Sequence, residues 1–229
     1  HMDALALVDT FGVVSPHAMK YFVQQVQSRI KKRLEAHFHQ DFGMGVANTI
    51  MALSLGVEVM HTTVLGIGER SGNTPMEDVV MALKTMYGVD CGIDTTKLTP
   101  LANLVQRLTG VAVPSNKAIV GSGLYQIESG IIASWFKNCG EKNATELFPI
   151  RWSAVGQPPA EIVMGKGSGI DSVNAWLRDV GMQVSEEDAM KVLQATKLHS
   201  LKNKKMLTHA EFRDLARSVL GRSQQQAAE

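Results

Sequence analysis

Short apolar runs alternate with amphipathic stretches through the first ninety residues. The runs have the length and composition of buried strands and cover 4–8, 34–39 and 57–63. Apolar positions at helical spacing predict a helix after each run, over about 16–33, 45–55 and 75–87. A repeated strand–helix order with short connections is typical of a parallel sheet with right-handed crossovers. We therefore expect an α/β fold here.

Turn and cap residues mark the ends of these helices. Pro16 stands at the first helical position after Ser15, and basic residues 31–33 suit the C-terminal end of the same helix. The sequence of 74–77, Thr-Pro-Met-Glu, predicts a capping box for the third helix, which ends at Gly88.

The pattern changes after residue 90, where helical segments follow one another without clear strands. They are expected over 99–110, 125–136, 169–180 and in two stretches opened by capping boxes at 185–188 and 208–211. Between them, 140–168 is predicted to be loop around a short helix, and the polar tail 224–229 to fray. We expect three parts: 3–90, a linker subdomain over 91–150, and a mostly helical subdomain over 151–222.

Composition narrows the classes of function. The 229 residues are 45% hydrophobic and 20% charged, with a net charge of +1. This composition is ordinary for a soluble globular protein. The sequence has no concentration of basic residues that would indicate a nucleic-acid partner. No apolar run reaches the ~18 residues that a membrane span needs. Cys91 and Cys139 form no disulfide or metal pattern, which favours buried free thiols and a cytoplasmic location.

Two histidines give the chain its candidate chemistry. His37 and His39 are two residues apart at the end of a predicted strand, so both side chains lie on one face. A glycine-rich loop, 66–73, follows the next strand and ends in Asn73, which adds an oxygen donor. Thr10 also follows a strand. Since the C-terminal ends of parallel strands lie together, this spacing predicts a divalent-metal site for Zn, Mn, Mg or Co.

Simpler interpretations compete with the metal site. A histidine pair at this spacing is more often structural than metal-binding, and only the downstream loop raises the metal interpretation above it. Other histidines have no companion ligands and are expected in the core or in solvent; they are His17, His61, His199 and His209. The lysines at 202, 204 and 205 are predicted to be a solvated helix end.

Several segments resemble the DRE-TIM metallolyase (HMGL-like) superfamily, and most closely its Claisen-condensing branch. That branch contains 2-isopropylmalate, homocitrate and citramalate synthases. Residues 8–12 are similar to its D-T-x-G strand, 37–41 to its H-x-H-N-D signature with Gln40 in place of Asn, and 66–73 to its G-x-G-E-R-x-G-N loop. Residues 113–117 and 162–169 resemble segments that follow the barrel. The combination of H-x-H with the glycine-rich loop is specific.

The resemblance implies a fold and an activity. It implies a TIM barrel, of which 3–90 would be the C-terminal part, about three βα units, and a divalent metal. The implied reaction condenses an acyl-CoA with a 2-oxo acid. His37, His39 and Asn73 would be metal ligands, and Thr10 would bind the 2-oxo acid carboxylate. Glu69 and Arg70 would be catalytic-loop residues that organise the loop by pairing with each other or with neighbouring strands.

Three departures from the family pattern qualify this expectation. The strand that carries the D-R-E motif is absent, so we expect an inactive fragment that needs the missing barrel half or a homodimer partner. The H-E-x-G-I-H segment appears as 127–132 with isoleucine in place of both histidines. Gly167 replaces a frequent histidine.

Two other functions stay open on the sequence alone. The chain could be a non-catalytic or split-barrel assembly module, because three strands leave unpaired edges and an uncovered apolar barrel face. It could also catalyse C–C bond cleavage like HMG-CoA lyase. The lyase branch carries a cysteine in the loop that corresponds to 66–73, and this loop has none, which favours condensation.

Overall fold

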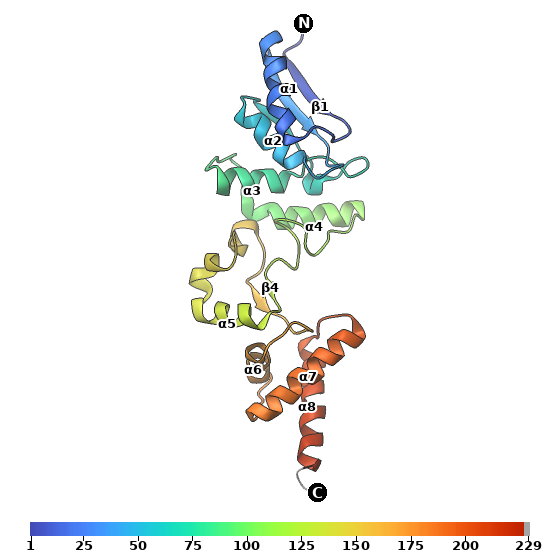
Figure 1. Ribbon diagram of the computed structural model, residues 1–229, viewed down its shortest axis with the longest axis vertical. Coiled ribbons are helices and arrows are strands. Elements are labelled where there is room, and N and C mark those ends of the chain that lie inside the picture. The colour runs from blue at the N-terminus through green and yellow to red at the C-terminus, as the bar shows by residue number, and fades with distance from the viewer. Residues whose placement is uncertain (227–229) are drawn as a thin grey trace. The chain divides into compact units, whose positions relative to one another are not determined.

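The computed structural model describes residues 1–226. The chain forms two compact units (Figure 1). Unit 1 contains residues 1–124 and 153–157, and unit 2 contains 125–152 and the residues from 158 onward. The three-part division expected from sequence stays a prediction.

Unit 1 is built on three parallel strands in the order β1-β2-β3. Its elements along the chain are β1 (Ala4–Asp9), α1 (Pro16–Arg29), β2 (Arg33–Phe38), α2 (Gly45–Ser54), β3 (Val59–His61), α3 (Met76–Met86) and α4 (Leu98–Thr109). Short 3-10 turns precede α3 and α4, at Val64–Gly66 and Thr95–Lys97. The expected α/β class is confirmed.

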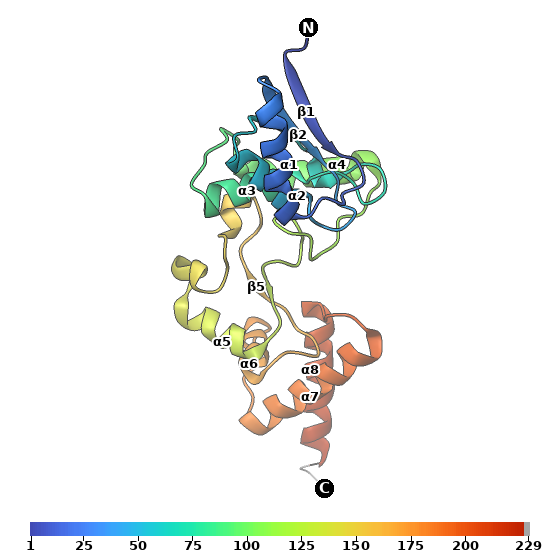
Figure 2. The ribbon, with the colours of Figure 1, turned by 45° about the horizontal axis from the view of Figure 1, so that its top comes forward.

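One face of the sheet carries the core of unit 1. Leu7, Ala36 and Phe38 alternate with outward-facing residues and are almost fully buried. They pack against α1 and α2, chiefly on Met19 and Val23 of α1, and Figure 2 shows both helices beside β1 and β2. The apolar side chains that alternate along the strands therefore pack against those that recur at helical spacing on α1, and together they form one apolar layer.

The opposite face of the sheet is open in unit 1. In the register of the strands, Val8, His37 and His61 lie side by side. Val8 is 48% exposed, and Glu35 lies on the same face as His37. The open face is of mixed chemistry, because the same register places Ala6, Val8 and Val59 beside one carboxylate and two imidazoles.

The cap predictions had mixed outcomes in unit 1. Ser15 caps α1 and accepts a hydrogen bond from the amide of Ala18 at 3.3 Å. The predicted box at 74–77 is wrong. Thr74 Oγ1 instead donates to the carbonyl of Phe38 at 3.1 Å, and Glu77 accepts from the amide of Leu65 at 3.0 Å. Tertiary partners therefore compete successfully for both side chains.

Unit 2 is mostly helical. Its elements are β4 (Gln126–Ile127), α5 (Gly130–Cys139), β5 (Glu161–Ile162), α6 (Ile170–Asp179), α7 (Glu186–Asn203) and α8 (His209–Gln226), with 3-10 turns at Glu141–Glu146 and Trp152–Val155; the second turn runs into unit 1. The predicted helix over 125–136 is wrong at its start, since β4 pairs there with β5. The predicted tail 224–229 is helical to Gln226, and its last three residues lie outside the described part.

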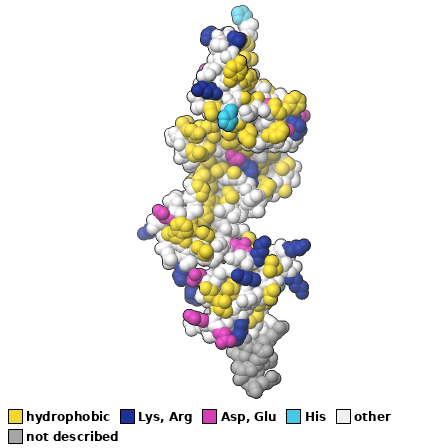
Figure 3. All heavy atoms as spheres, in the orientation of Figure 1, with side chains coloured by type: hydrophobic (Ala, Val, Ile, Leu, Met, Phe, Trp, Pro, Cys, Tyr) yellow, Lys and Arg dark blue, Asp and Glu magenta, His cyan; other side chains and the backbone are white. Residues whose placement is uncertain are grey.

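The surface agrees with the simpler expectations. Lys202, Lys204 and Lys205 are exposed at the end of α7, and Figure 3 shows basic side chains gathered in this region. Both cysteines are free as expected, but neither is buried: Cys91 is exposed and Cys139 is half-buried. Within residues 1–226, no helix has the length and apolar character of a membrane span.

The capping box of α8 gives a testable pH dependence. The carboxylate of Glu211 accepts a hydrogen bond from Lys205 at 2.5 Å and from the amide of Thr208 at 2.9 Å. These bonds, that of Lys205 first, lower the pKa of Glu211 to about 2. A lowered carboxyl pKa stabilises the fold above its ordinary value of 4.5. We expect this contribution to fade as the pH falls from 4.5 towards 2, and the ¹³C titration of Glu211 to show it.

Glu211→Gln should remove this part of the pH dependence of unfolding. Glu187→Gln, which removes an 80% exposed first-turn carboxylate of α7, is the matched control and should change it less. A Glu211 that titrates near 4.5 in the folded chain would contradict the prediction.

Candidate functional site

The structure brings His37 and His39 together at the end of β2. Their ring centroids are 5.4 Å apart and the rings are tilted by 59°. Both side chains are half-buried. Phe38 between them points into the core and is 1% exposed. Strand alternation therefore anchors the strand from one face and presents two imidazoles on the other.

Asn73 joins this pair from the glycine-rich loop. It forms an isolated antiparallel bridge with His39, so the loop after β3 lies directly against the end of β2. Its side-chain nitrogen donates to the carbonyl of Ile67 at 3.3 Å. Its Oδ1 atom and the Nδ1 atom of His39 are buried without a hydrogen-bond partner. Buried polar atoms are rarely left unpaired. The Asn73 oxygen is therefore free to accept a hydrogen bond or to bind a metal, and the His39 nitrogen is free to bind a metal or to form a hydrogen bond.

The charge state of His37 suits a metal ligand. Burial, followed by the nearby imidazoles of His39 and His61, lowers the pKa of His37 below its ordinary value. All three causes disfavour the imidazolium form. The neutral imidazole is the form that binds a metal.

The candidate ligands could fill part of the coordination sphere of a divalent ion. Among residues 1–226, no group of three or more His, Cys, Asp or Glu side chains is placed to hold a metal. His37, His39 and the Asn73 amide oxygen supply two nitrogens and one oxygen. Such a set matches the borderline ions expected from the sequence, and leaves coordination positions for other oxygen donors.

Arg70 ties the loops that follow the three strands. Its guanidinium donates to both carboxylate oxygens of Asp41, at 2.7 and 3.1 Å, and to the carbonyl of Thr10. The hydrogen bond from Arg70 is the main reason that the pKa of Asp41 lies below its ordinary value. The guanidinium also lies 5.5 Å from the ring centre of Phe11. Arg70 therefore crosslinks the loops after β1, β2 and β3.

The other predicted residues lie nearby with fewer contacts. Glu69 is 89% exposed, and its nearest basic group is Arg70 at 3.9 Å. Thr10 is exposed at the end of β1. Asp9, which the sequence left without a role, is 5% exposed and accepts hydrogen bonds from the amides of Val13 and Val14 at 3.1 and 2.9 Å. It closes the loop that carries Thr10.

His61 was missed as a site neighbour. Its ring centroid lies 5.5 Å from that of His37, and its Nε2 lies 3.0 Å from the carboxylate of Glu35. The expectation that it stands without companions is wrong. No pattern within the sequence predicts this neighbour, because only the pairing of β3 with β2 places His61 beside His37.

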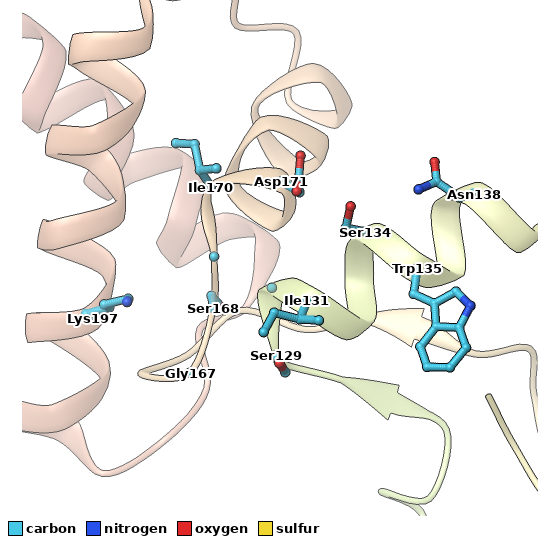
Figure 4. A pocket seen from close by; sticks show the side chains of 12 residues that line it. Ser129, Ile131, Ser134, Trp135, Asn138, Gly167, Ser168, Ile170, Asp171 and Lys197 are labelled. Atoms are coloured by element: carbon cyan, nitrogen blue, oxygen red, sulfur yellow. The ribbon is translucent and has the colours of Figure 1, made fainter.

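A separate cavity of about 780 Å³ lies in unit 2 (Figure 4). One side of α5 along its length and the first turn of α6 line it, and its charged lining residues are Asp171 and Lys197. Ile131 and Gly167, two positions at or beside the family's altered segments, also line it. None of the predicted site residues does.

Comparison with known proteins gives the context of these residues. The model of the HMGL-like family matches residues 2–105. A putative (R)-citramalate synthase CimA of Methanopyrus kandleri is 40% identical over 222 residues, which are 96% of this chain and 42% of that protein. The homocitrate synthase AksA of the same organism is 38% identical, over 95% of this chain and 53% of its own length.

Two further similarities complete the comparison. A 2-isopropylmalate synthase of Methanocaldococcus jannaschii is 38% identical over 81% of this chain and 35% of its own length. The crystal structure of an HMG-CoA lyase of Bacillus subtilis overlaps 50% of this chain and 41% of that chain, with a TM-score of 0.46 and 27% identity. The chain spans about half the length, or less, of the curated relatives it matches.

Proposed function

We propose that this chain belongs to the HMGL-like, DRE-TIM metallolyase superfamily, whose family model matches residues 2–105, and that it is part of an enzyme that condenses an acyl-CoA with a 2-oxo acid. One observation carries the proposal. The H-x-H pair of β2 and the G-E-R-x-G-N loop meet through the His39–Asn73 bridge, with unpaired donor atoms on both residues. Relatives named citramalate, homocitrate and isopropylmalate synthases support this reaction class.

The residues take distinct roles in this proposal. His37, His39 and Asn73 would hold one side of a divalent ion, and such an ion would supply Lewis acidity towards the keto group of the 2-oxo acid. Thr10 binds the carboxylate of that acid. Arg70 keeps the three loops in place through Asp41 and Thr10, and Glu69 extends the same loop.

The fold proposal follows from the edges of the sheet. Within the described chain, β1 and β3 are each paired on one side only. The backbone N–H and C=O groups on their other sides are available to pair with further strands. We propose that the three βα units are units 6–8 of a TIM barrel. The remaining strands come from elsewhere in the whole protein or from a partner. The barrel interior is then the face that carries Glu35, His37 and His61.

An assay of products tests the proposed reaction. The protein that contains this chain is incubated with acetyl-CoA, a panel of 2-oxo acids and Zn, Mn, Co or Mg, and free CoA thiol is measured while products are identified by mass spectrometry. We expect metal-dependent release of CoA and a 2-hydroxy diacid. EDTA treatment should abolish it, and added metal should restore it.

The competing functions predict other results of the same assay. Cleavage of 3-hydroxy-3-methylglutaryl-CoA without condensation would assign the lyase activity instead. No turnover in either direction, together with stable assembly on a partner through the open sheet edges, would favour the non-catalytic module.

A further inference from the structure

Lys117 is the centre of a charged cluster in unit 1 that lies outside the proposed metal shell. Its ammonium is 2.8 Å from Asp78 and 3.1 Å from Glu77. The three side chains are 19%, 17% and 2% exposed. Burial raises the pKa of Asp78 above its ordinary value, while Lys117 opposes that rise. Lys117 comes from the 113–117 segment, which the proposed reaction does not use.

Glu77 connects this cluster to the glycine-rich loop. Its second carboxylate oxygen accepts a hydrogen bond from the amide of Leu65 at 3.0 Å. Leu65 has a φ of 62°, which is left-handed backbone that a leucine adopts only at a cost. A charge-assisted hydrogen bond from its amide offsets that cost. Lys117 donates its hydrogen bonds to Asp78, at 2.8 and 3.0 Å, and its charge lies 3.1 Å from the other oxygen of Glu77, which accepts no hydrogen bond. The ammonium therefore acts on Glu77, and through it on the conformation of Leu65, by this charge–charge contact.

The conformation of Leu65 sets the position of Asn73. Gly66, the next residue, accepts a hydrogen bond through its carbonyl from the amide of Asn73 at 2.9 Å. A Cβ atom on Gly66 would lie 2.8 Å from the carbonyl oxygen of Asn73, so the two backbones are in close contact. Ile67, one residue further, accepts from the Asn73 side chain. A rotation of the 65–66 turn therefore moves Asn73.

We propose that Lys117 is a positioning residue for the metal site, acting through Glu77 and the 65–66 turn on Asn73. The inference rests on the proposed role of Asn73 as a ligand. It assigns a function to the 113–117 segment and extends the site to residues that contact neither metal nor substrate. A purely structural Lys117 would stabilise the fold and leave the geometry of Asn73 unchanged.

Three variants of the full chain separate the two roles. Lys117→Met removes the charge, Lys117→Arg keeps it, and Lys191→Met removes a lysine that pairs with two carboxylates on the exposed surface of α7. The readouts are Co²⁺ affinity by chelator competition, the side-chain amide resonances of Asn73, and the urea midpoint. We expect Lys117→Met to weaken Co²⁺ binding about 10-fold, the size of an effect transmitted by outer-shell residues.

The same variant should shift the Asn73 side-chain resonances in the metal-free chain. Lys117→Arg should restore both readouts, and Lys191→Met should change neither. Leu65→Gly, which adopts the left-handed turn without help from Glu77, should recover most of the affinity in the Lys117→Met background. Glu77→Gln serves if Lys117→Met does not fold. It removes the charge that Lys117 pairs with while an amide oxygen remains as an acceptor, so it should shift the same resonances.

A lower urea midpoint with unchanged Asn73 resonances and unchanged affinity would overturn the positioning role. So would a loss of affinity that Leu65→Gly leaves uncorrected. If the wild-type chain binds no Co²⁺, the ligand role of Asn73 fails, and the metal-free resonances still decide whether Lys117 positions the loop.

Discussion

Replacing His37 or His39 by alanine is expected to weaken Zn²⁺ or Co²⁺ binding by roughly 100-fold or more, since loss of outer-shell partners alone costs about 10–100-fold. The proposed site contains two imidazoles and one amide oxygen as metal ligands. Each histidine variant therefore removes one of only three protein ligands. Chelator competition measures the affinity, and the visible spectrum of bound Co²⁺ reports the coordination.

His17→Ala is the matched control for this prediction. His17 is exposed on α1, in the same unit, and its removal should leave affinity and spectrum unchanged. Asn73→Ala should weaken binding less than either histidine variant, because a neutral amide is the weaker ligand. Equal binding by wild type and His37→Ala would contradict the metal site itself.

Gly72→Ala is expected to have the second large effect, on stability. Gly72 has a φ of 89°, and a Cβ atom there would overlap the carbonyl oxygen of Gly66. The alanine variant must therefore both adopt unfavourable backbone and break the contact between the two ends of the glycine-rich loop. We expect a loss of about 3 kcal/mol in the free energy of unfolding, measured with urea.

Gly43→Ala separates the two parts of this cost. Gly43 has a φ of 73°, but nothing lies within 4 Å of the position of its Cβ atom. Its alanine variant should lose only about 1 kcal/mol, the cost of left-handed backbone alone. If both variants lose the same free energy, the close approach of Gly72 to Gly66 is not what constrains the loop.

Local signals predicted the order of the elements in unit 1, but α1 ends at Arg29 before the basic residues 31–33, and β3 covers only Val59–His61 of the predicted 57–63. The apolar runs that become β1 and β2 begin and end within about one residue of the strands, and the cap at Ser15 is as expected. Each of these features depends on interactions within a few residues, which the sequence displays directly. In unit 2, the segment at 125–128 was predicted as helix because its pairing partner, β5, is more than thirty residues away.

Side-chain partners were harder to predict than elements. Thr74 and Glu77 have the spacing of a capping box, yet they bind Phe38 and Leu65. Arg70 was expected to organise its loop, but its choice of Asp41 and Thr10 over Glu69 is a property of the assembled sheet. Long polar side chains have many partners within reach, and only the packing of the strands selects among them.

The sequence by itself determined the α/β class, the parallel order implied by repeated strand–helix units, and the candidate ligands His37, His39 and Asn73. Spacing of two residues on a strand and glycine at tight turns follow from backbone geometry, so they can be recognised in one dimension. Only the tertiary structure decided that His61 faces His37, that Arg70 crosslinks three loops, and that Lys117 reaches Glu77. Those contacts join residues from 24 to 60 positions apart in the sequence, and no local preference encodes which distant groups meet.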